Sequence, residues 1–455
     1  MLLDFRVKNY KSFIDEVSFT MLAAPKQKGL DYSLFKTTHK GKQIKALPTS
    51  VIYGPNASGK TNIISAMDTL RSIILRGNIR NADEGNVANP AASNLELIPN
   101  SFLEKAKPVE FFIDFMEKET RVQYKLSIDL GLFSDAEYDR KVIYEELIVD
   151  GTQLFERTHN ALKMQMEKAE TDFSSEDGNI GRNAIGVLVE KSLNQEELLL
   201  TNGFRLIVAP ELVKFINDWF ASKFMVICRA DSLHLIKKFT EPQKKTIYVD
   251  RTVNEAARVF GINSNALGYI PGENDAEPKL VSVCADVSGK KLAVDAESFE
   301  SYGTIRFVNT FPLVMRAIAT GATLVIDEFD ASLHPMALMS IINIFHNDDV
   351  NVHHAQLIFN THNPIFLNSN LMRRDEIKFV ERNDDTHKSI LYALSDFGTA
   401  GENGVRLHED YMKSYFISRY GAIKDIDFTP IFEGIVGKEK RQDNGETEDK
   451  PKILF

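Results

Sequence analysis

One short run constrains the fold of this chain more than any other part. Residues 54–61 read GPNASGKT and match G-x-x-x-x-G-K-[ST], the pattern of a phosphate-binding P-loop. The apolar run before it, residues 47–53, predicts a buried strand, and the apolar side chains of residues 62–70 recur at helical spacing. A loop between a strand and a helix is the context that this motif needs, so we predict an α/β nucleotide-binding fold. A glycine loop that precedes a helix by chance is the alternative.

The chemistry of this loop is local. Gly54 and Gly59 allow a tight turn that points backbone N–H groups inward, and the helix that begins near Lys60 adds its positive end. We expect the Lys60 ammonium to reach the β- and γ-phosphates of a nucleotide and the Thr61 hydroxyl to ligate Mg²⁺. The residues expected to bind the nucleotide here are Asn56, Ala57, Ser58, Gly59, Lys60, Thr61 and Asn62.

Length and composition narrow the class of protein. The 455 residues suffice for two or three domains, and no apolar run approaches the length of a membrane-spanning helix. Cys228 and Cys284 give neither metal-ligand spacing nor a disulfide framework, and the first residues lack the order of a secretory signal, so we expect a cytoplasmic protein. The net charge of −10 argues against a surface coated for nucleic-acid binding.

The rest of the first half predicts strands and then helices. Alternating patterns predict two antiparallel strands in residues 1–22 and further strand pairs between residues 108 and 155, the last closing on the turn Asp150-Gly151. From residue 159 to 285 we expect a mainly helical insertion. Its Lys-rich stretch 237–251 either touches nucleic acid or an acidic partner, or is a solvated face.

A second motif completes the predicted site. The apolar run 323–326 ends in Asp327 and Glu328, which is a Walker B pattern. Asp327 is expected to hold Mg²⁺, and Glu328 to orient or deprotonate an attacking water. Because both motifs follow apolar strands, they can meet at one edge of a sheet. Their wide separation in the chain implies an insertion between two halves of one nucleotide-binding fold.

Three smaller pieces surround Walker B. Ser301 and Gly303 stand where a helix begins, and such a helix start can donate N–H groups to a γ-phosphate. Residues 331–334 follow Walker B directly. The apolar run 356–360 is followed closely by His362, whose imidazole could contact a γ-phosphate or the attacking water.

This order of motifs resembles the ABC-type ATPases of the SMC, recombination-repair and OLD group. The resemblance implies a P-loop NTPase of the ABC ATPase head type with an antiparallel β-lobe and an inserted mainly helical domain. Ser301 and Gly303 would belong to a signature that contacts the ATP of a partner protomer, residues 331–334 would be the D-loop, and His362 the switch histidine. Tyr302 replaces a glycine of the usual signature. The domains so implied are residues 1–158, 159–285, 286–405 and 406–455.

The runs FRVKNYKSF, GPNASGKT, DEFDASLHP and YFISRYGAI also resemble the compact ATPases of bacterial abortive-infection and anti-phage systems. That resemblance implies an ATP- and Mg²⁺-dependent hydrolase that forms an ATP-bridged dimer or a higher assembly. It also implies a separately encoded toxic effector, often a TOPRIM nuclease, and a phage-derived trigger. Two alternatives stay open: a DNA-repair ATPase that clamps DNA with a nuclease partner, and an assembly scaffold whose ATP is never hydrolysed.

Overall fold

The computed structural model describes residues 1–25, 27, 30, 33–80, 95–100, 107–131, 140–158, 161–164, 194–204, 210–228, 246–262, 264, 266–271, 278–399, 404–406 and 409–433. The chain divides into two units, Met1–Ala422 and Ile423–Phe455. The large unit contains the P-loop, the signature residues, Walker B and His362. The second unit is described as far as residue 433, where a short turn is closed by the N–H groups of Ile431 and Phe432 on the carbonyl of Phe428.

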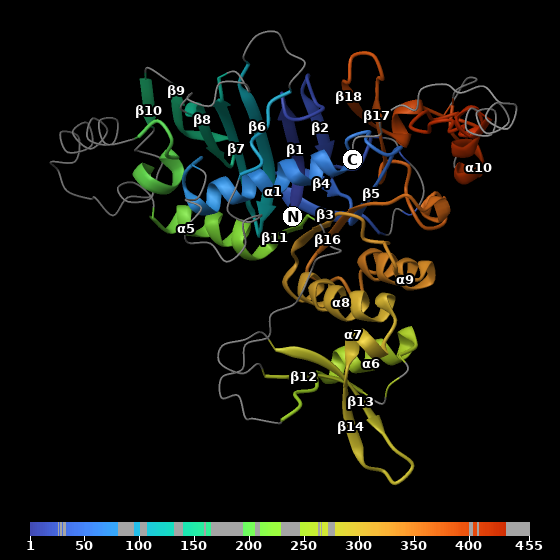
Figure 1. The fold of residues 1–455 in the computed structure, drawn as a ribbon. Coiled ribbons are helices and arrows are strands. Elements are labelled where there is room, and N and C mark those ends of the chain that lie inside the picture. The colour runs from blue at the N-terminus through green and yellow to red at the C-terminus, as the bar shows by residue number, and fades with distance from the viewer. Residues whose placement is uncertain are drawn as a thin grey trace, which may run out of the picture. The chain divides into compact units, whose positions relative to one another are not determined.

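The first layer of the large unit is an antiparallel sheet, drawn from blue to green in Figure 1. Its strand order is β10-β9-β8-β7-β6-β1-β2. Inward-facing residues such as Phe5, Phe111 and Tyr124 alternate with more exposed ones, as expected for a sheet with one solvated face. The strands are β1 (Leu2–Lys8), β2 (Val17–Thr20), β6 (Val109–Glu117), β7 (Thr120–Asp129), β8 (Lys141–Val149), β9 (Thr152–Thr158) and β10 (Ala161–Met164).

The second layer is a six-stranded sheet in the order β11-β15-β16-β5-β17-β18. Its first five strands are parallel and β18 pairs antiparallel at the edge. The central strands are buried throughout, which explains their uninterrupted apolar sequences. The strands are β5 (Thr49–Tyr53), β11 (Phe224–Ile227), β15 (Thr323–Ile326), β16 (Gln356–Asn360), β17 (Ile377–Arg382) and β18 (Ser389–Ala393).

Helix α1 (Lys60–Arg76) lies between these two sheets (Figure 1). Its Ile63, Met67 and Ile73 belong to one core cluster with residues of the antiparallel sheet and with Val325 and Ile358 of the parallel sheet. The helix that follows the P-loop is therefore buried on two sides. An α/β fold of the P-loop NTPase class, with an antiparallel lobe, is confirmed.

The remaining elements surround this core. Helices α8 (Tyr302–Thr320) and α9 (Pro335–His346) flank β15 in the chain, and a three-stranded antiparallel sheet β12-β13-β14 precedes α8. Phe260 of α6 stacks on Phe307 of α8 at 4.5 Å between ring centroids. The other elements are β3 (Phe35–His39), β4 (Lys42–Ala46), η2 (Leu199–Phe204), α5 (Pro210–Asp218), η3 (Trp219–Lys223), α6 (Arg251–Phe260), β12 (Ala266–Ile270), β13 (Lys279–Ala285), β14 (Lys291–Asp295), α7 (Ala296–Phe299), η5 (Pro364–Phe366), η6 (Leu394–Phe397) and α10 (Tyr411–Phe416).

The described part of segment 159–285 contains both helices and strands. Its helices are η2, α5, η3 and α6, and its strands are β10, β11, β12 and β13. The mainly helical insertion that we expected stays a prediction. Strand β11 pairs in parallel with β15 and so extends the parallel sheet. Four apolar residues followed by a cysteine carry no periodicity that could separate such a buried strand from a helix. Residues 165–193 and most of the Lys-rich stretch, 237–245, lie outside the described residues.

None of the described helices combines the length and the apolar character needed to cross a bilayer. Cys228 and Cys284 are both free thiols.

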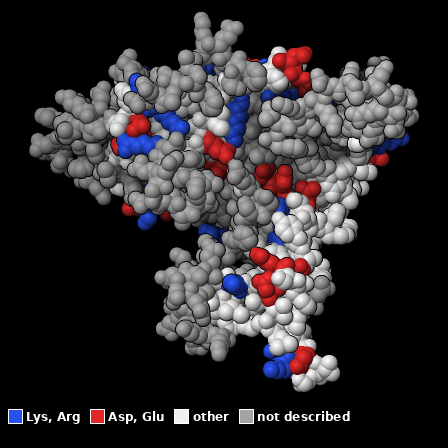
Figure 2. All heavy atoms as spheres, in the orientation of Figure 1, with Lys and Arg blue, Asp and Glu red and all other residues white. Residues whose placement is uncertain are grey.

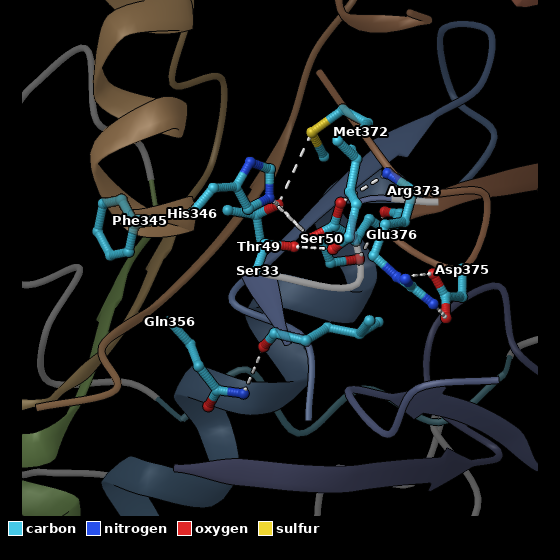
Figure 3. Close-up of polar contacts among 12 residues, drawn as sticks. Ser33, Thr49, Ser50, Phe345, His346, Gln356, Met372, Arg373, Asp375 and Glu376 are labelled. Carbon is cyan, nitrogen blue, oxygen red and sulfur yellow. Dashed lines mark hydrogen bonds and ion pairs between the residues drawn. The ribbon is translucent and has the colours of Figure 1, made fainter. Parts of the chain in front are cut away.

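A buried polar network holds the end of β5 opposite to the P-loop (Figure 3). The Thr49 hydroxyl donates to Glu376 Oε1 at 2.8 Å, and His346 Nε2 of α9 lies 2.9 Å from the same oxygen. Glu376 Oε2 accepts the backbone N–H of Arg373 at 2.7 Å. Burial alone would raise the pKa of Glu376, but the charge and hydrogen bond of His346, the Arg373 N–H and the Thr49 hydroxyl together lower it.

Because this pKa is lowered, the ionised Glu376 stabilises the fold above its unfolded-state pKa, and that stabilisation is lost as the pH falls through the folded-state pKa. We therefore expect Glu376→Gln to reduce the free energy of unfolding at pH 7 by about 3 kcal/mol, because His346 loses its anionic partner. The difference between variant and wild type should shrink below about pH 4. Urea unfolding at a series of pH values measures both effects.

Glu255→Gln is the matched control. Glu255 pairs with Arg251 at 2.9 Å on the exposed side of α6, and its side chain is 60% exposed. An exposed pair at this spacing contributes about 0.5 kcal/mol or less. If the free energy of unfolding depends on pH equally in Glu376→Gln and in wild type, an ionised Glu376 does not stabilise the fold.

Candidate functional site

The P-loop joins β5 to α1 with its backbone pressed against neighbouring elements. A Cβ atom on Gly54 would lie 2.3 Å from the Val380 carbonyl oxygen, and one on Gly59 would lie 2.6 Å from Ser12 Oγ. Neither position has room for a larger side chain. Both glycines of the motif are therefore required by close packing as well as by the turn.

The surroundings of Lys60 are those of an anion-binding residue. Its side chain is buried, and Nζ donates to the carbonyl oxygens of Gly54 at 2.7 Å and Pro55 at 3.0 Å. Burial lowers the pKa of Lys60 to about 8, partly offset by the carboxylates of Asp327, Glu328 and Asp330. Carbonyl oxygens neutralise no charge, so this ammonium at a helix start fits phosphate oxygens.

Asp327 stands at the centre of the site. It directly follows β15, and its Oδ1 accepts hydrogen bonds from the Thr61 hydroxyl at 3.0 Å and from the Asn360 amide. Two predicted Mg²⁺ ligands far apart in the sequence are thus in contact. In the described part of the chain, no group of three His, Cys, Asp or Glu side chains could hold a metal unaided. Mg²⁺ here would take its other ligands from phosphates and water, which is its usual coordination in nucleotide sites.

Glu328 differs from Asp327 in both exposure and backbone conformation. Asp327 is buried and Glu328 is exposed. Glu328 has φ of 49°, a left-handed conformation that is unfavourable for a residue with a side chain. Its N–H donates to Asn360 Oδ1, and its carbonyl accepts from Arg306 Nη2. The turn therefore separates two adjacent carboxylates, one held inside the site and one directed outward.

This geometry agrees with the comparison to known families. Residues 50–186 and 198–368 match the family described as "AAA domain, putative AbiEii toxin, Type IV TA system". The chain belongs to this family. The matched residues include the P-loop, the signature region, Walker B and His362.

Solved structures similar to this AAA-domain chain are heads of SMC proteins. They are the SmcHead bound to the C-winged helix domain of ScpA (14% identity, 86% of this chain and 97% of that chain, TM-score 0.36), the SMC head domain from Thermotoga maritima (13%, 86% and 98%, 0.37), and an Smc head domain with an extended coiled coil bound to the C-terminal domain of ScpA derived from Pyrococcus furiosus (11%, 86% and 96%, 0.37). At these TM-scores we base no argument on the likeness. No curated protein matches the chain.

In this AAA-domain protein His362 is exposed, just beyond the end of β16. Partial burial and the positive charge of Lys60 lower its pKa, and the carboxylates of Asp330, Glu328 and Asp327 partly offset them. A lowered pKa keeps the imidazole neutral at pH 7, so that one ring nitrogen can accept a hydrogen bond while the other donates.

Two of the expected nucleotide-binding residues stand at the start of α8, and one of them, Gly303, packs on the loop after β15. Ser301 caps α8, with its Oγ accepting the Thr304 N–H at 3.1 Å. A Cβ atom on Gly303 would lie 2.5 Å from the carbonyl oxygen of Ser332, so the start of α8 packs directly on the predicted D-loop. Ser301 and the neighbouring Tyr302 are exposed. They are thus open to a second molecule.

The other P-loop residues are supported from neighbouring elements. Asn56 and Ala57 are exposed, and Ala57 has a left-handed φ of 62°. The Ser58 hydroxyl is buried and without a hydrogen-bond partner among the described residues. Its carbonyl accepts the hydroxyl of Ser389 at 2.6 Å, and the Asn62 amide donates to Ser12 Oγ at 2.8 Å. The roles predicted for these residues in nucleotide binding remain predictions.

Sequence reasoning missed the residues that support this site. Asn360 joins Asp327 to the Glu328 N–H, and its only signal was a polar residue at the end of an apolar run. Arg306 gave no signal, because an arginine in a helix is normally exposed.

Cys228 was noted only as a free thiol. It directly follows β11, at the sheet edge where the Asp327 N–H donates to the Ile227 carbonyl at 3.0 Å.

The close contact at Gly303 makes a testable prediction. In Gly303→Ala the added methyl must displace the Ser332 carbonyl, at a cost of about 1–3 kcal/mol in the free energy of unfolding. We expect faster hydrogen–deuterium exchange at residues 328–334, measured by mass spectrometry.

Gly289→Ala serves as the control. A Cβ at Gly289 would meet nothing within 4 Å, so this variant adds only the strain of a left-handed residue. Its exchange at residues 328–334 should equal that of wild type. Unchanged exchange in Gly303→Ala as well would show that the D-loop is not held by this contact.

Proposed function

We propose that this chain is an ATP-binding and ATP-hydrolysing sensor and scaffold of a bacterial anti-phage defence system. The observation that carries the proposal is the contact of Thr61 with Asp327, beside the buried ammonium of Lys60. The family description, with its AAA domain and its toxin–antitoxin context, supports the same reading.

In this proposal the P-loop amides and Lys60 bind the phosphates of ATP. Thr61 and Asp327 would hold Mg²⁺, which would supply positive charge against the charge that develops during phosphoryl transfer. Glu328, exposed and held by its own backbone, orients the attacking water and accepts its proton. Neutral His362 donates to the γ-phosphate or binds the same water.

The exposed start of α8 gives the proposed site its second half. Ser301 caps α8 and Gly303 packs on the predicted D-loop of the same chain. The exposed side of this helix start would face the γ-phosphate of a partner protomer in an ATP-bridged dimer. The dimer, or a higher assembly of dimers, would then hold a separately encoded toxic effector and release it on a phage-derived trigger. The quoted motifs resemble the ATPase subunit AriA of the PARIS system, whose type of effector, a TOPRIM nuclease, we propose as the partner.

The alternative of a DNA clamp receives less support. On the face drawn in Figure 2, the Lys and Arg side chains of the described residues lie in separate places, and Asp and Glu side chains form groups between them. Arg251, at the end of the Lys-rich stretch, is paired with Glu255. A duplex-binding channel needs a row of free Lys and Arg on one surface and gives strongly salt-dependent affinity.

The site itself is tested with Glu328→Gln. This variant keeps every contact of the phosphate loop but loses the group that accepts the proton of water, so we expect ATP binding with turnover at least about a hundredfold slower. The trapped nucleotide should hold the dimer together, which size-exclusion chromatography with light scattering would detect. Lys60→Ala is the comparison variant and should neither bind ATP nor dimerise with it. Wild-type turnover in Glu328→Gln would refute the assigned base.

The scaffold role is tested separately. We expect the chain, copurified with the product of its neighbouring gene, to form a complex whose mass changes when Mg-ATP is added. Native mass spectrometry of wild type and Lys60→Ala gives the comparison. If the chain copurifies with no partner and hydrolyses ATP without one, the scaffold role is refuted and only the ATPase activity remains.

A further inference from the structure

Arg306 lies in the first turns of α8 and is buried with its charge hardly compensated. Its side chain is 5% exposed. Nη2 donates to the Glu328 carbonyl oxygen, whereas Nε and Nη1 are buried without a hydrogen-bond partner in the described part of the chain. The guanidinium therefore touches the backbone of the residue that we assign as the catalytic base.

Stability alone does not account for this residue. Burying a guanidinium costs several kcal/mol, and one hydrogen bond to an uncharged carbonyl returns only about 1–3 kcal/mol. An apolar side chain of similar length could be buried at this position without that cost. Buried donors without partners are costly, and a functional role can explain why they are kept.

The Glu328 backbone supplies that explanation. Its left-handed conformation costs about 1–2 kcal/mol and persists only where the surroundings hold it. Two side chains hold it from opposite ends: Asn360 accepts its N–H, and Arg306 donates to its carbonyl. Asn360 extends from the neighbouring strand, but Arg306 comes from the helix whose first residues are open to a second molecule.

We propose that Arg306 is a positioning residue that holds Glu328 in its outward conformation and couples it to the start of α8. The proposal rests on the proposed function, because it assigns Glu328 as the base. A partner protomer that engages Ser301 would shift the helix start, and Arg306 passes that shift to the Glu328 carbonyl. Gly303, packed on the Ser332 carbonyl, links the same helix start to the loop beyond Glu328.

The test compares Arg306→Met with Arg306→Lys. In Arg306→Met we expect kcat for phosphate release to fall about tenfold to a hundredfold, because the base loses its alignment. The Kd for ATP should stay within about twofold, since no phosphate contact is removed, and Tm should be unchanged or higher, since a buried charge is gone. Arg306→Lys keeps one donor and should recover part of kcat.

Arg374→Met is the matched control. Arg374 is equally buried and also has an unpartnered Nε, but its Nη2 donates to the carbonyls of Leu394 and Gly398, away from the site. Its replacement removes a buried charge in the same way and should leave kcat per folded molecule unchanged, whatever its effect on Tm. If Arg306→Met also keeps wild-type kcat per folded molecule, Arg306 is structural and the proposal fails.

A second measurement separates this proposal from the proposed function. Hydrogen–deuterium exchange at residues 327–331 should quicken in Arg306→Met and not in Arg374→Met, whether or not the protein hydrolyses ATP. If the wild-type protein releases no phosphate but exchange is still faster in Arg306→Met than in Arg374→Met, the proposed ATPase activity is refuted and the positioning role is retained. Unchanged exchange at these residues in Arg306→Met would refute the positioning role.

Discussion

The hydrogen bond between Thr61 and Asp327 depends on the parallel alignment of β5, β16 and β15. Parallel neighbours bring their carboxyl ends to one edge of the sheet, so the P-loop after β5 and the carboxylates after β15 face each other across β16. Asn360, at the end of that intervening strand, fills the gap and bonds to both Asp327 and the Glu328 N–H. One register thus positions the P-loop, the proposed metal ligands and the proposed base. The polar network of Thr49, His346 and Glu376 secures the other end of β5.

Strained backbone and unsatisfied polar groups occur at this edge of the sheet, although other described parts of the chain have them too. Ala57, Glu328 and Ser332 have left-handed backbones, the Ser58 hydroxyl lacks a partner, and Arg306 keeps two buried donors without one in the described residues. The core between the two sheets and α1 is made of apolar packing. Of these features, the held backbone of Glu328 bears most directly on the proposed site, because a strained conformation persists only where its surroundings hold it.

Local patterns predicted the elements that carry the motifs. The strand, loop and helix around Lys60, the strand before Asp327 and the strand before His362 were all recognisable, because runs of apolar residues next to glycine or acid limit the possibilities. The hairpin turn at Asp150-Gly151 was equally clear. Strand β11 and the hairpin β3–β4 were missed, since a short apolar run and the mostly polar residues 35–46 show no clear periodicity. Arg306 and Asn360 were missed because their importance comes from what they touch.

The sequence by itself determined that the chain carries a P-loop and a pair of acids after a strand, because these motifs need only adjacent residues. It also indicated the layered α/β class, since buried strands and amphipathic helices differ in their periodicity. Only the tertiary structure decided which strand separates the two motifs, that Glu328 turns outward while Asp327 turns inward, and that Arg306 of α8 reaches the Glu328 carbonyl. Those facts depend on the order of strands in the sheet and on contacts between distant residues, which no local pattern encodes.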